Sequence, residues 1–204
     1  MSELDTFTFY PLRIDSQTKA LSSIEPTRAL DNELTALNQL HRALLGIDGG
    51  APVPPPPIPV NPKRTANVNK LRDSGNADFR KGRYAEAIKF YTLGLQMALT
   101  RPVWEPPQLV HEEVATLYAN RAQAHMATHG WAEGAVDAEA SVEAKKTGNA
   151  KAWWRRGKCL LEMGRLEEAQ EWVRRGLEME GEEHDLLALR AEIEGLLDNA
   201  SASL

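Results

Sequence analysis

The sequence lacks several features that define other classes of protein. It has one cysteine, Cys159, in 204 residues. No disulfide can form within the chain, which excludes the disulfide-rich scaffolds of small secreted proteins. No apolar run approaches the roughly 18 residues that a membrane-spanning helix needs, and residues 1–5 lack the basic and apolar order of a signal peptide. These absences predict a soluble intracellular protein.

Positive charge and metal-ligand clusters are also scarce. The formal net charge is −5, which is untypical of proteins dedicated to nucleic acids, so we expect no nucleic-acid partner. The five histidines are scattered, and His125 and His129, four residues apart, lack a third ligand in the pattern. We therefore expect neither a metal ion nor another cofactor.

Proline, by contrast, is concentrated in one place. Seven of the twelve prolines fall between Pro52 and Pro62. Because proline fixes φ and has no N–H donor, this stretch predicts a semi-rigid polyproline II linker over residues 51–66. The alternative is a ligand for an SH3 or WW domain, which the lack of a flanking basic residue in a PxxP register disfavours.

The region before the linker, residues 1–50, predicts a hairpin followed by one helix. Apolar and polar residues alternate over 7–14, and a turn is expected after them. Leucines then recur at spacings of four and three from Leu30 to Leu44, which is the pattern of a helix with one apolar stripe. Gly46, together with Gly49 and Gly50, is expected to end it. A hairpin and one helix make a poor independent core. The stripe is expected either to fold back on the rest of the chain or to dock on a partner.

After the linker the sequence repeats. Three blocks carry small residues at the same relative positions, at intervals of 12 and 7 residues. The three sets are Gly75, Ala87 and Gly94; Ala122, Gly134 and Ser141; and Gly157, Ala169 and Gly176. Small residues at fixed places let two antiparallel helices pack closely, so each block predicts a helix, a short turn and a second helix.

These intervals resemble those of the tetratricopeptide repeat, a helix-turn-helix unit of about 34 residues. The resemblance covers residues 67–180 and implies an all-α right-handed superhelix of three repeats, to which the N-terminal region adds a small α/β element. Extra residues separate the first two blocks around 100–108, where Trp104 predicts an ordered loop.

The last segment, residues 181–204, predicts one more amphipathic helix. Its apolar face is expected to comprise Leu186, Leu189, Ile193, Leu196 and Leu197. Repeat arrays need a terminal element that shields the exposed face of the last unit, and we interpret this helix as that cap.

Polar residues recur on the first helix of each block, and these helices line the concave face of such an array. Arg72 and Asn76 are four residues apart, as are Lys151 and Arg155, so each pair shares one helix face. Asn120 stands on the helix between them. A main-chain carboxylate accepts several hydrogen bonds, and those from charged donors are strong. The five residues therefore predict a site for the C-terminal carboxylate of a peptide.

The same five positions resemble the dicarboxylate clamp of chaperone-binding tetratricopeptide domains. That family has a basic residue and Asn in the first repeat, Asn in the second, and Lys and Arg in the third. Arg72 stands where the family usually has Lys, so the charge is kept while the geometry changes. The resemblance implies that the groove binds the Glu-Glu-Val-Asp C-terminus of a cytosolic heat-shock chaperone, with the seventy-kilodalton class favoured over the ninety-kilodalton class.

The order of the parts resembles that of the small cytosolic tetratricopeptide subunits of fungal post-translational Sec translocation complexes. This resemblance implies a peripheral protein on the cytosolic face of the endoplasmic reticulum, without a membrane span of its own. A membrane-anchored Sec partner subunit would hold it through the N-terminal region and the repeat surface. The clamp would then bring chaperone-bound precursors to the channel.

Two other functions stay open at the level of the residues. A structural scaffold whose groove holds a partner helix would bind without needing a free C-terminus. An enzyme would need an active site, but the sequence has no nucleophile–base arrangement and no phosphate-binding glycine loop. Cys159 is expected to be a packed core thiol rather than a reactive one. We therefore expect a protein that is not an enzyme.

Overall fold

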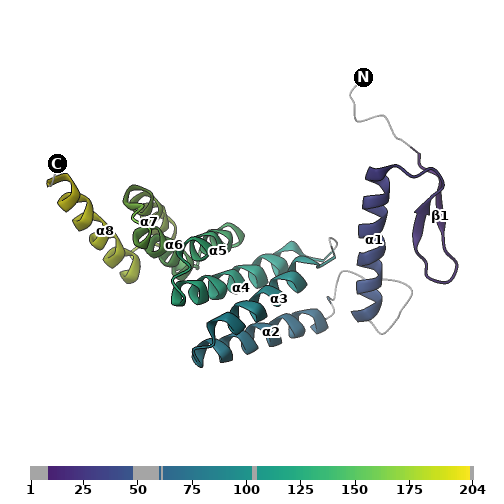
Figure 1. The fold of residues 1–204 in the computed structure, drawn as a ribbon, viewed down its shortest axis with the longest axis horizontal. Helices are drawn as coiled ribbons and strands as arrows, with labels where there is room; N and C mark the ends of the chain where they lie inside the picture. The colour runs from purple at the N-terminus through teal and green to yellow at the C-terminus, as the bar shows by residue number, and fades with distance from the viewer. Residues whose placement is uncertain (1–8, 48–59, 61, 103–104, 203–204) are drawn as a thin grey trace, which may run out of the picture. The chain divides into compact units, whose positions relative to one another are not determined.

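The structure is a computed structural model that describes residues 9–47, 60, 62–102 and 105–202. The chain divides into two compact units, Met1–Pro56 and Pro57–Leu204 (Figure 1). Within the described residues, the first unit holds a β-hairpin and one helix, and the second holds seven helices. The predicted all-α architecture with a small N-terminal α/β element is confirmed.

The N-terminal unit begins with an antiparallel hairpin of β1 (Leu12–Ile14) and β2 (Leu21–Ser23), with Ile14 opposite Leu21. Asp15 closes the turn between them, because its Oδ1 accepts hydrogen bonds from the backbone N–H of Thr18 at 2.6 Å and from the hydroxyl of Thr18 at 2.8 Å. The alternating segment and turn predicted from the sequence thus form a hairpin.

Helix α1 (Arg28–Ile47) packs against β2. One of its side chains, Asn38, forms hydrogen bonds with the backbone of β2 as a neighbouring strand would. The Asn38 amide accepts from the Leu21 N–H at 2.8 Å and donates to the Leu21 carbonyl at 2.7 Å. On the predicted leucine stripe, Leu34 is buried whereas Leu37 is 47% exposed. The helix therefore covers the outer edge of β2 but leaves part of its own apolar face open.

The predicted segment boundaries differ from the observed ones on both sides of the proline-rich stretch. Helix α1 continues through Gly46 to Ile47, so Gly46 does not by itself end the helix. One helical glycine costs only about 1 kcal/mol relative to alanine. Gly49 and Gly50, which are also predicted to end it, lie outside the described residues. The side chain of Leu44 and residues 48–59 lie outside the described part. Helix α2 begins at Pro62, within the segment predicted as linker, because the first helical position needs no N–H donor.

The second unit is a series of antiparallel helices, each contacting the next along the chain (Figure 1). The pairs are α2 (Pro62–Arg80) with α3 (Tyr84–Leu99), α4 (Pro107–Ala127) with α5 (Trp131–Ala144), and α6 (Ala150–Glu162) with α7 (Leu166–Glu180). Helix α8 (His184–Ala202) follows and contacts both α6 and α7. No helix of the described residues is long and apolar enough to cross a membrane.

The small residues of the repeated pattern sit where helices approach most closely. A Cβ atom on Gly75 would lie 2.5 Å from a ring carbon of Tyr91, and one on Gly157 would lie 2.7 Å from a methyl carbon of Val173. Such distances are far below van der Waals contact, so only glycine fits without a shift of the partner helix. These two glycines mark the contact between the two helices of a pair, as predicted. Other small residues of the pattern mark contacts between pairs, since a Cβ atom on Gly94 of α3 would lie 3.0 Å from Leu117 of α4.

The turn within each pair places one residue in the left-handed region at the same position of the repeat. Gly82 has φ +74° and Gly164 has φ +72°, and the equivalent residue of the middle pair is His129 with φ +58°. Glycine adopts this conformation without steric cost, whereas His129 is held there with strain.

Helix α8 covers the end of the array, as predicted for a cap. Leu186, Leu189 and Ile193 are almost fully buried and join the core cluster that contains Trp153 and Trp172. Leu196, which the helical periodicity assigned to the same face, is 43% exposed. The predicted apolar face is therefore wrong at Leu196, whereas Leu197 packs against the core cluster as predicted.

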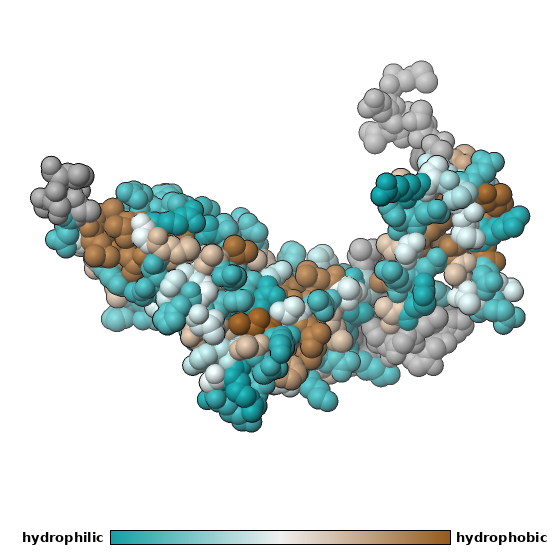
Figure 2. Space-filling view, viewed as in Figure 1, coloured by the Kyte–Doolittle hydropathy of each residue, from teal (hydrophilic) through white to brown (hydrophobic). Residues whose placement is uncertain are grey.

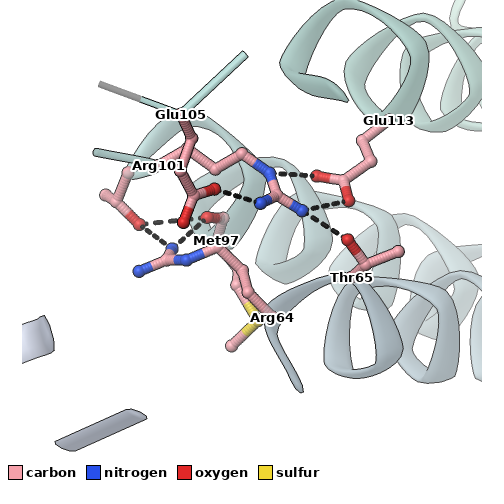
Figure 3. Close-up of polar contacts among 7 residues, drawn as sticks. Arg64, Thr65, Met97, Arg101, Glu105 and Glu113 are labelled. Atoms are coloured by element: carbon pink, nitrogen blue, oxygen red, sulfur yellow. Dashed lines mark hydrogen bonds and ion pairs between the residues drawn. The ribbon is translucent and has the colours of Figure 1, made fainter. Parts of the chain in front are cut away.

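The insertion between the first two pairs is fastened by a buried arginine (Figure 3). The Arg101 guanidinium, whose side chain is 0% exposed, donates to both Glu113 carboxylate oxygens at 2.6 and 3.0 Å. It also donates to the Thr65 hydroxyl at 2.6 Å and pairs with Glu105. One side chain thus ties the insertion to α2 and α4. Trp104, on which the prediction of an ordered loop rested, lies outside the described residues.

Candidate functional site

The first two helix pairs meet in a hydrogen-bonded cluster around Asn76 of α2. Its side-chain oxygen accepts from the Tyr91 hydroxyl at 2.8 Å and from the Asn120 side-chain amide at 3.1 Å. Tyr91 comes from α3 and is 2% exposed, and Asn120 comes from α4. The structure therefore brings together the two asparagines that the sequence placed in one site.

Arg155 of α6 adds a positive charge to this side of the array. Its Nε donates to the side-chain oxygen of Gln123 on α4 at 2.8 Å. Burial lowers the pKa of the Arg155 guanidinium, and the buried Tyr91 hydroxyl lies close enough to act electrostatically on it. The three helix pairs thus contribute neighbouring polar groups.

Arg155, like the buried Arg64, makes no ion pair with a carboxylate within the described part of the chain. Glu105 and Glu113 act electrostatically on Arg64, however, whereas the group that acts on Arg155 is the Tyr91 hydroxyl. Arg101 pairs with Glu105 and Glu113, and Arg121 makes two hydrogen bonds of 2.7 Å to Asp137. Hydrogen bonds and charge from those carboxylates raise the pKa of Arg101 and Arg121. A desolvated charge without a counterion is costly, so Arg155 is the residue of this unit best suited to meet an anionic ligand.

The two remaining predicted clamp residues do not join this cluster. Arg72 donates to its neighbour Asp73 at 2.9 and 3.1 Å, and its side chain is 34% exposed. Lys151 is exposed in the first turn of α6. Both side chains are long and solvent-accessible, so a ligand would have to draw them in, and Arg72 would have to leave or share Asp73.

A pocket of about 240 Å³ borders Arg72 between α2 and α4. Its apolar lining includes Val68, Leu109 and Leu117, and Thr65 and Asn69 contribute polar groups. The pocket lies between the N-terminal halves of α2 and α4. One of its lining residues, Glu113, is held in place by its ion pair with Arg101 (Figure 3). An apolar side chain of a bound peptide would fit there.

Sequence reasoning missed two residues of the cluster, Tyr91 and Gln123. Tyr91 stands four residues after Ala87, at the repeat position where the other blocks have Ala138 and Val173. The signal available was a residue with a polar tip at a core position. Gln123 lies three residues after Asn120 and so shares its helix face, but glutamine on a helix is too common to stand out.

The other candidate residues have structural explanations. Burial raises the pKa of Cys159 to about 12, so the thiol is protonated at neutral pH, as expected for a core thiol. His125 lies 3.8 Å from a carboxylate oxygen of Asp137, which Arg121 already binds. Among the described residues no group of His, Cys, Asp and Glu side chains has the arrangement of a metal site.

Comparisons with known proteins agree with this geometry. The model of the tetratricopeptide repeat family matches residues 130–193. The ER protein translocation subcomplex subunit sec67 of Schizosaccharomyces pombe is 39% identical over 126 residues, which is 62% of this chain and 65% of that protein. The matches thus span less than two thirds of the length of the first curated relatives.

Two solved structures have a similar fold. A chain of the Sec complex from S. cerevisiae superposes with a TM-score of 0.68 at 21% identity, covering 93% of this chain and 98% of that one. The first tetratricopeptide domain of Spaghetti (RPAP3), bound to the HSP90 peptide SRMEEVD, superposes with a TM-score of 0.54 at 27% identity, covering 65% of this chain and 97% of that one. Over residues 130–193 the chain is similar to the tetratricopeptide repeat family, and it is similar in sequence to an ER protein translocation subcomplex subunit of Schizosaccharomyces pombe.

Proposed function

We propose that the groove lined by α2, α4 and α6 binds the C-terminal carboxylate of a peptide. The observation that carries this proposal is Arg155, a partly buried cation whose hydrogen-bond partner is the neutral Gln123. A carboxylate would supply the missing negative charge and accept N–H groups from Asn76 and Asn120. Arg72 and Lys151 are long enough to close over the ligand from either end of the groove.

The ligand we infer is the Glu-Glu-Val-Asp C-terminus of a cytosolic heat-shock chaperone of the seventy-kilodalton class. The RPAP3 domain, similar in fold and 27% identical, was solved with a peptide that ends in the same four residues. The choice of the seventy-kilodalton class follows from the likeness to a translocation subunit. Because a short flexible peptide loses conformational freedom on binding, we expect a Kd in the micromolar range, about −8 kcal/mol.

The cellular role we propose is that of a non-enzymatic adaptor in translocation into the endoplasmic reticulum. The 39% identity to sec67 supports this role. The chain would sit on the cytosolic face of the membrane and hold the chaperone there, so that the precursor it carries is released near the channel.

The N-terminal unit is the part we propose to dock on the membrane-anchored Sec partner subunit. Phe9 is 92% exposed, Ile14 67% and Ile24 50%, and Figure 2 shows apolar side chains on the surface of the hairpin. Exposed apolar groups gathered on so small a unit are typical of an interface. Asn38 already occupies the outer edge of β2, so the partner would meet the free side of β1. On the repeats, Leu93 is 49% exposed and Val136 is 65% exposed, and we propose these side chains as further contacts for the partner subunit.

A titration with a short peptide that ends in Glu-Glu-Val-Asp tests the proposal. We would compare its free-acid and C-terminal amide forms against the full chain and Arg155→Ala by isothermal titration calorimetry. Arg174→Ala is the matched control, because Arg174 is exposed on α7 and pairs with Glu171 and Glu178. We expect micromolar binding of the acid that is weakened at least about tenfold by amidation or by Arg155→Ala, and left unchanged by Arg174→Ala.

Equal binding of both peptide forms would argue instead for a scaffold that holds a partner helix. The docking proposal has its own test, which is binding of the chain to a purified Sec complex in detergent. Ile14→Ser should weaken that binding while the affinity for the peptide stays the same. Unchanged binding to the complex would remove the N-terminal unit from the interface.

A further inference from the structure

The orientation of the Asn76 amide is fixed from two sides. Its Oδ1 atom accepts hydrogen bonds from the Tyr91 hydroxyl and the Asn120 Nδ2. A carbonyl oxygen accepts two hydrogen bonds, so the acceptor of Asn76 is fully used. Its Nδ2, which carries two donors, is the end left for a ligand. A flip of the Asn76 amide would point its N–H donors at the N–H donors of the Asn120 amide. It would also leave the Tyr91 hydroxyl without its acceptor.

Tyr91 is itself held in place by packing. It is 2% exposed, and its ring lies so close to Gly75 that a Cβ atom there would be 2.5 Å from ring carbon Cε1. Gly75 directly precedes Asn76, so the residue that admits the ring is next to the residue whose amide the hydroxyl orients. Gly75 thus makes room for the Tyr91 ring and, by doing so, places the hydroxyl that orients the Asn76 amide.

Gln123 plays the corresponding part for Arg155. Its Oε1 accepts the Arg155 Nε–H at 2.8 Å, which occupies one edge of the guanidinium fork. The edge formed by the two Nη atoms is then the one that remains for bidentate binding of a carboxylate. Because Gln123 is neutral, it orients the guanidinium and leaves its positive charge intact. A carboxylate at this position would neutralise that charge.

We propose that Tyr91 and Gln123 are positioning residues that set the donors of Asn76 and Arg155 for a free carboxylate and so determine the preference for a peptide acid over its amide. This inference rests on the proposed function of the groove and deepens it. Neither residue needs to touch the ligand. Each acts by holding a donor that would otherwise rotate, and the loss of one such hydrogen bond corresponds to about a 3- to 10-fold change in affinity.

The test measures the ratio of the Kd values for the amide and acid forms of a peptide that ends in Glu-Glu-Val-Asp, with the full chain. The variants are Tyr91→Phe, which removes only the hydroxyl, and Gln123→Met, which keeps the length but removes the acceptor. Tyr84→Phe on the same helix as Tyr91, and Gln170→Met on the exposed face of α7, are the matched controls. Thermal unfolding of every variant is recorded alongside.

We expect each of the two variants to bind the acid about 3- to 10-fold more weakly, with little change for the amide, so the ratio falls while the controls keep it. Gln123→Glu should weaken acid binding more than Gln123→Met, because a carboxylate there pairs with Arg155 and competes with the ligand. A merely structural role would not produce that order.

Two results would overturn the inference while the proposed function stands: an unchanged ratio in Tyr91→Phe and Gln123→Met, or equal weakening of both peptide forms together with a lower Tm. A wild-type chain that does not distinguish the acid from the amide would instead overturn the proposed function, and the inference with it. The wild-type ratio thus separates the two failures.

Discussion

The substitution Arg101→Met should destabilise the repeat unit more than any loss of a surface ion pair. The Arg101 side chain is 0% exposed, and its partners Glu113 and Glu105 have side-chain exposures of 9% and 12%. Methionine fills most of the volume but removes the cation that pairs with both carboxylates. Arg64, which forms no ion pair with them, remains as the nearby charge. Breaking a buried pair from one side costs about 3–5 kcal/mol, mainly through the charge left behind.

The measurement is urea unfolding of the full chain followed by circular dichroism, with the slope m used to check that the transition is comparable. Arg174→Met is the control, because its ion pairs with Glu171 and Glu178 are exposed and surface pairs contribute little. We expect a large drop in the midpoint for Arg101→Met and none for the control.

A double-mutant cycle shows whether the stranded carboxylate is the cause. Glu113→Gln removes the charge that Arg101 neutralises, so Arg101→Met combined with Glu113→Gln should be more stable than the sum of the two single effects predicts. Equal destabilisation by Arg101→Met and Arg174→Met, or strict additivity in the cycle, would refute the reasoning and reduce Arg101 to a surface contact of the insertion.

Three further predictions concern packing, backbone and a buried thiol. Gly75→Ala should destabilise by about 1–3 kcal/mol through its clash with Tyr91, measured by urea unfolding, and should also weaken peptide binding; an alanine variant of wild-type stability would contradict the packing. Gly164→Ala should cost about 1 kcal/mol because of its positive φ alone, as no atom lies within 4 Å of the new methyl group, whereas Gly195→Ala inside α8 should stabilise by a similar amount; two Tm shifts of the same sign would disprove this. With its pKa raised by burial from 9.0 to about 12, Cys159 contributes stability that is present below pH 9 and lost as the pH rises towards 12; rapid iodoacetamide labelling of the folded chain at pH 8 would contradict it.

The repeats could be predicted because their packing depends on small residues at fixed intervals. Gly75 and Gly157 are required by contacts with specific partner side chains, and such requirements leave a periodic trace in the sequence. The hairpin and α1 were likewise readable from alternating and helical apolar patterns. Gly46 alone does not mark the end of α1, because one helical glycine costs little free energy and the helix continues to Ile47.

Other parts depend on contacts that no local pattern records. Nothing near Arg101 in the sequence distinguishes it from a surface arginine. Its partners Glu113 and Thr65 come from other helices and meet it only in the folded chain. Helical periodicity placed Leu196 with the buried leucines, yet it is 43% exposed while the next residue, Leu197, packs against the core. Such outcomes depend on which side chains of neighbouring helices a position meets, and not on the residue type alone.

The candidate site shows the same division. The positions of Asn76, Asn120 and Arg155 followed from their places in the repeat, and the structure brings the two asparagines into contact. The roles of Tyr91 and Gln123 follow from hydrogen bonds between helices that are far apart in sequence. Which arginines lack a counterion is a property of the folded chain alone.

The central claim is that a ligand carboxylate meets the charge of Arg155, and the side-chain Nε–H resonance of that residue reports on it most directly. The signal is assigned by its disappearance in Arg155→Lys and followed while a peptide that ends in Glu-Glu-Val-Asp is added as acid or as amide. We predict a saturable shift of the Arg155 signal with the acid at micromolar concentrations and a much smaller one with the amide. An Arg155 signal that stays in place while the acid peptide binds elsewhere, or that shifts equally with both forms, would contradict the account.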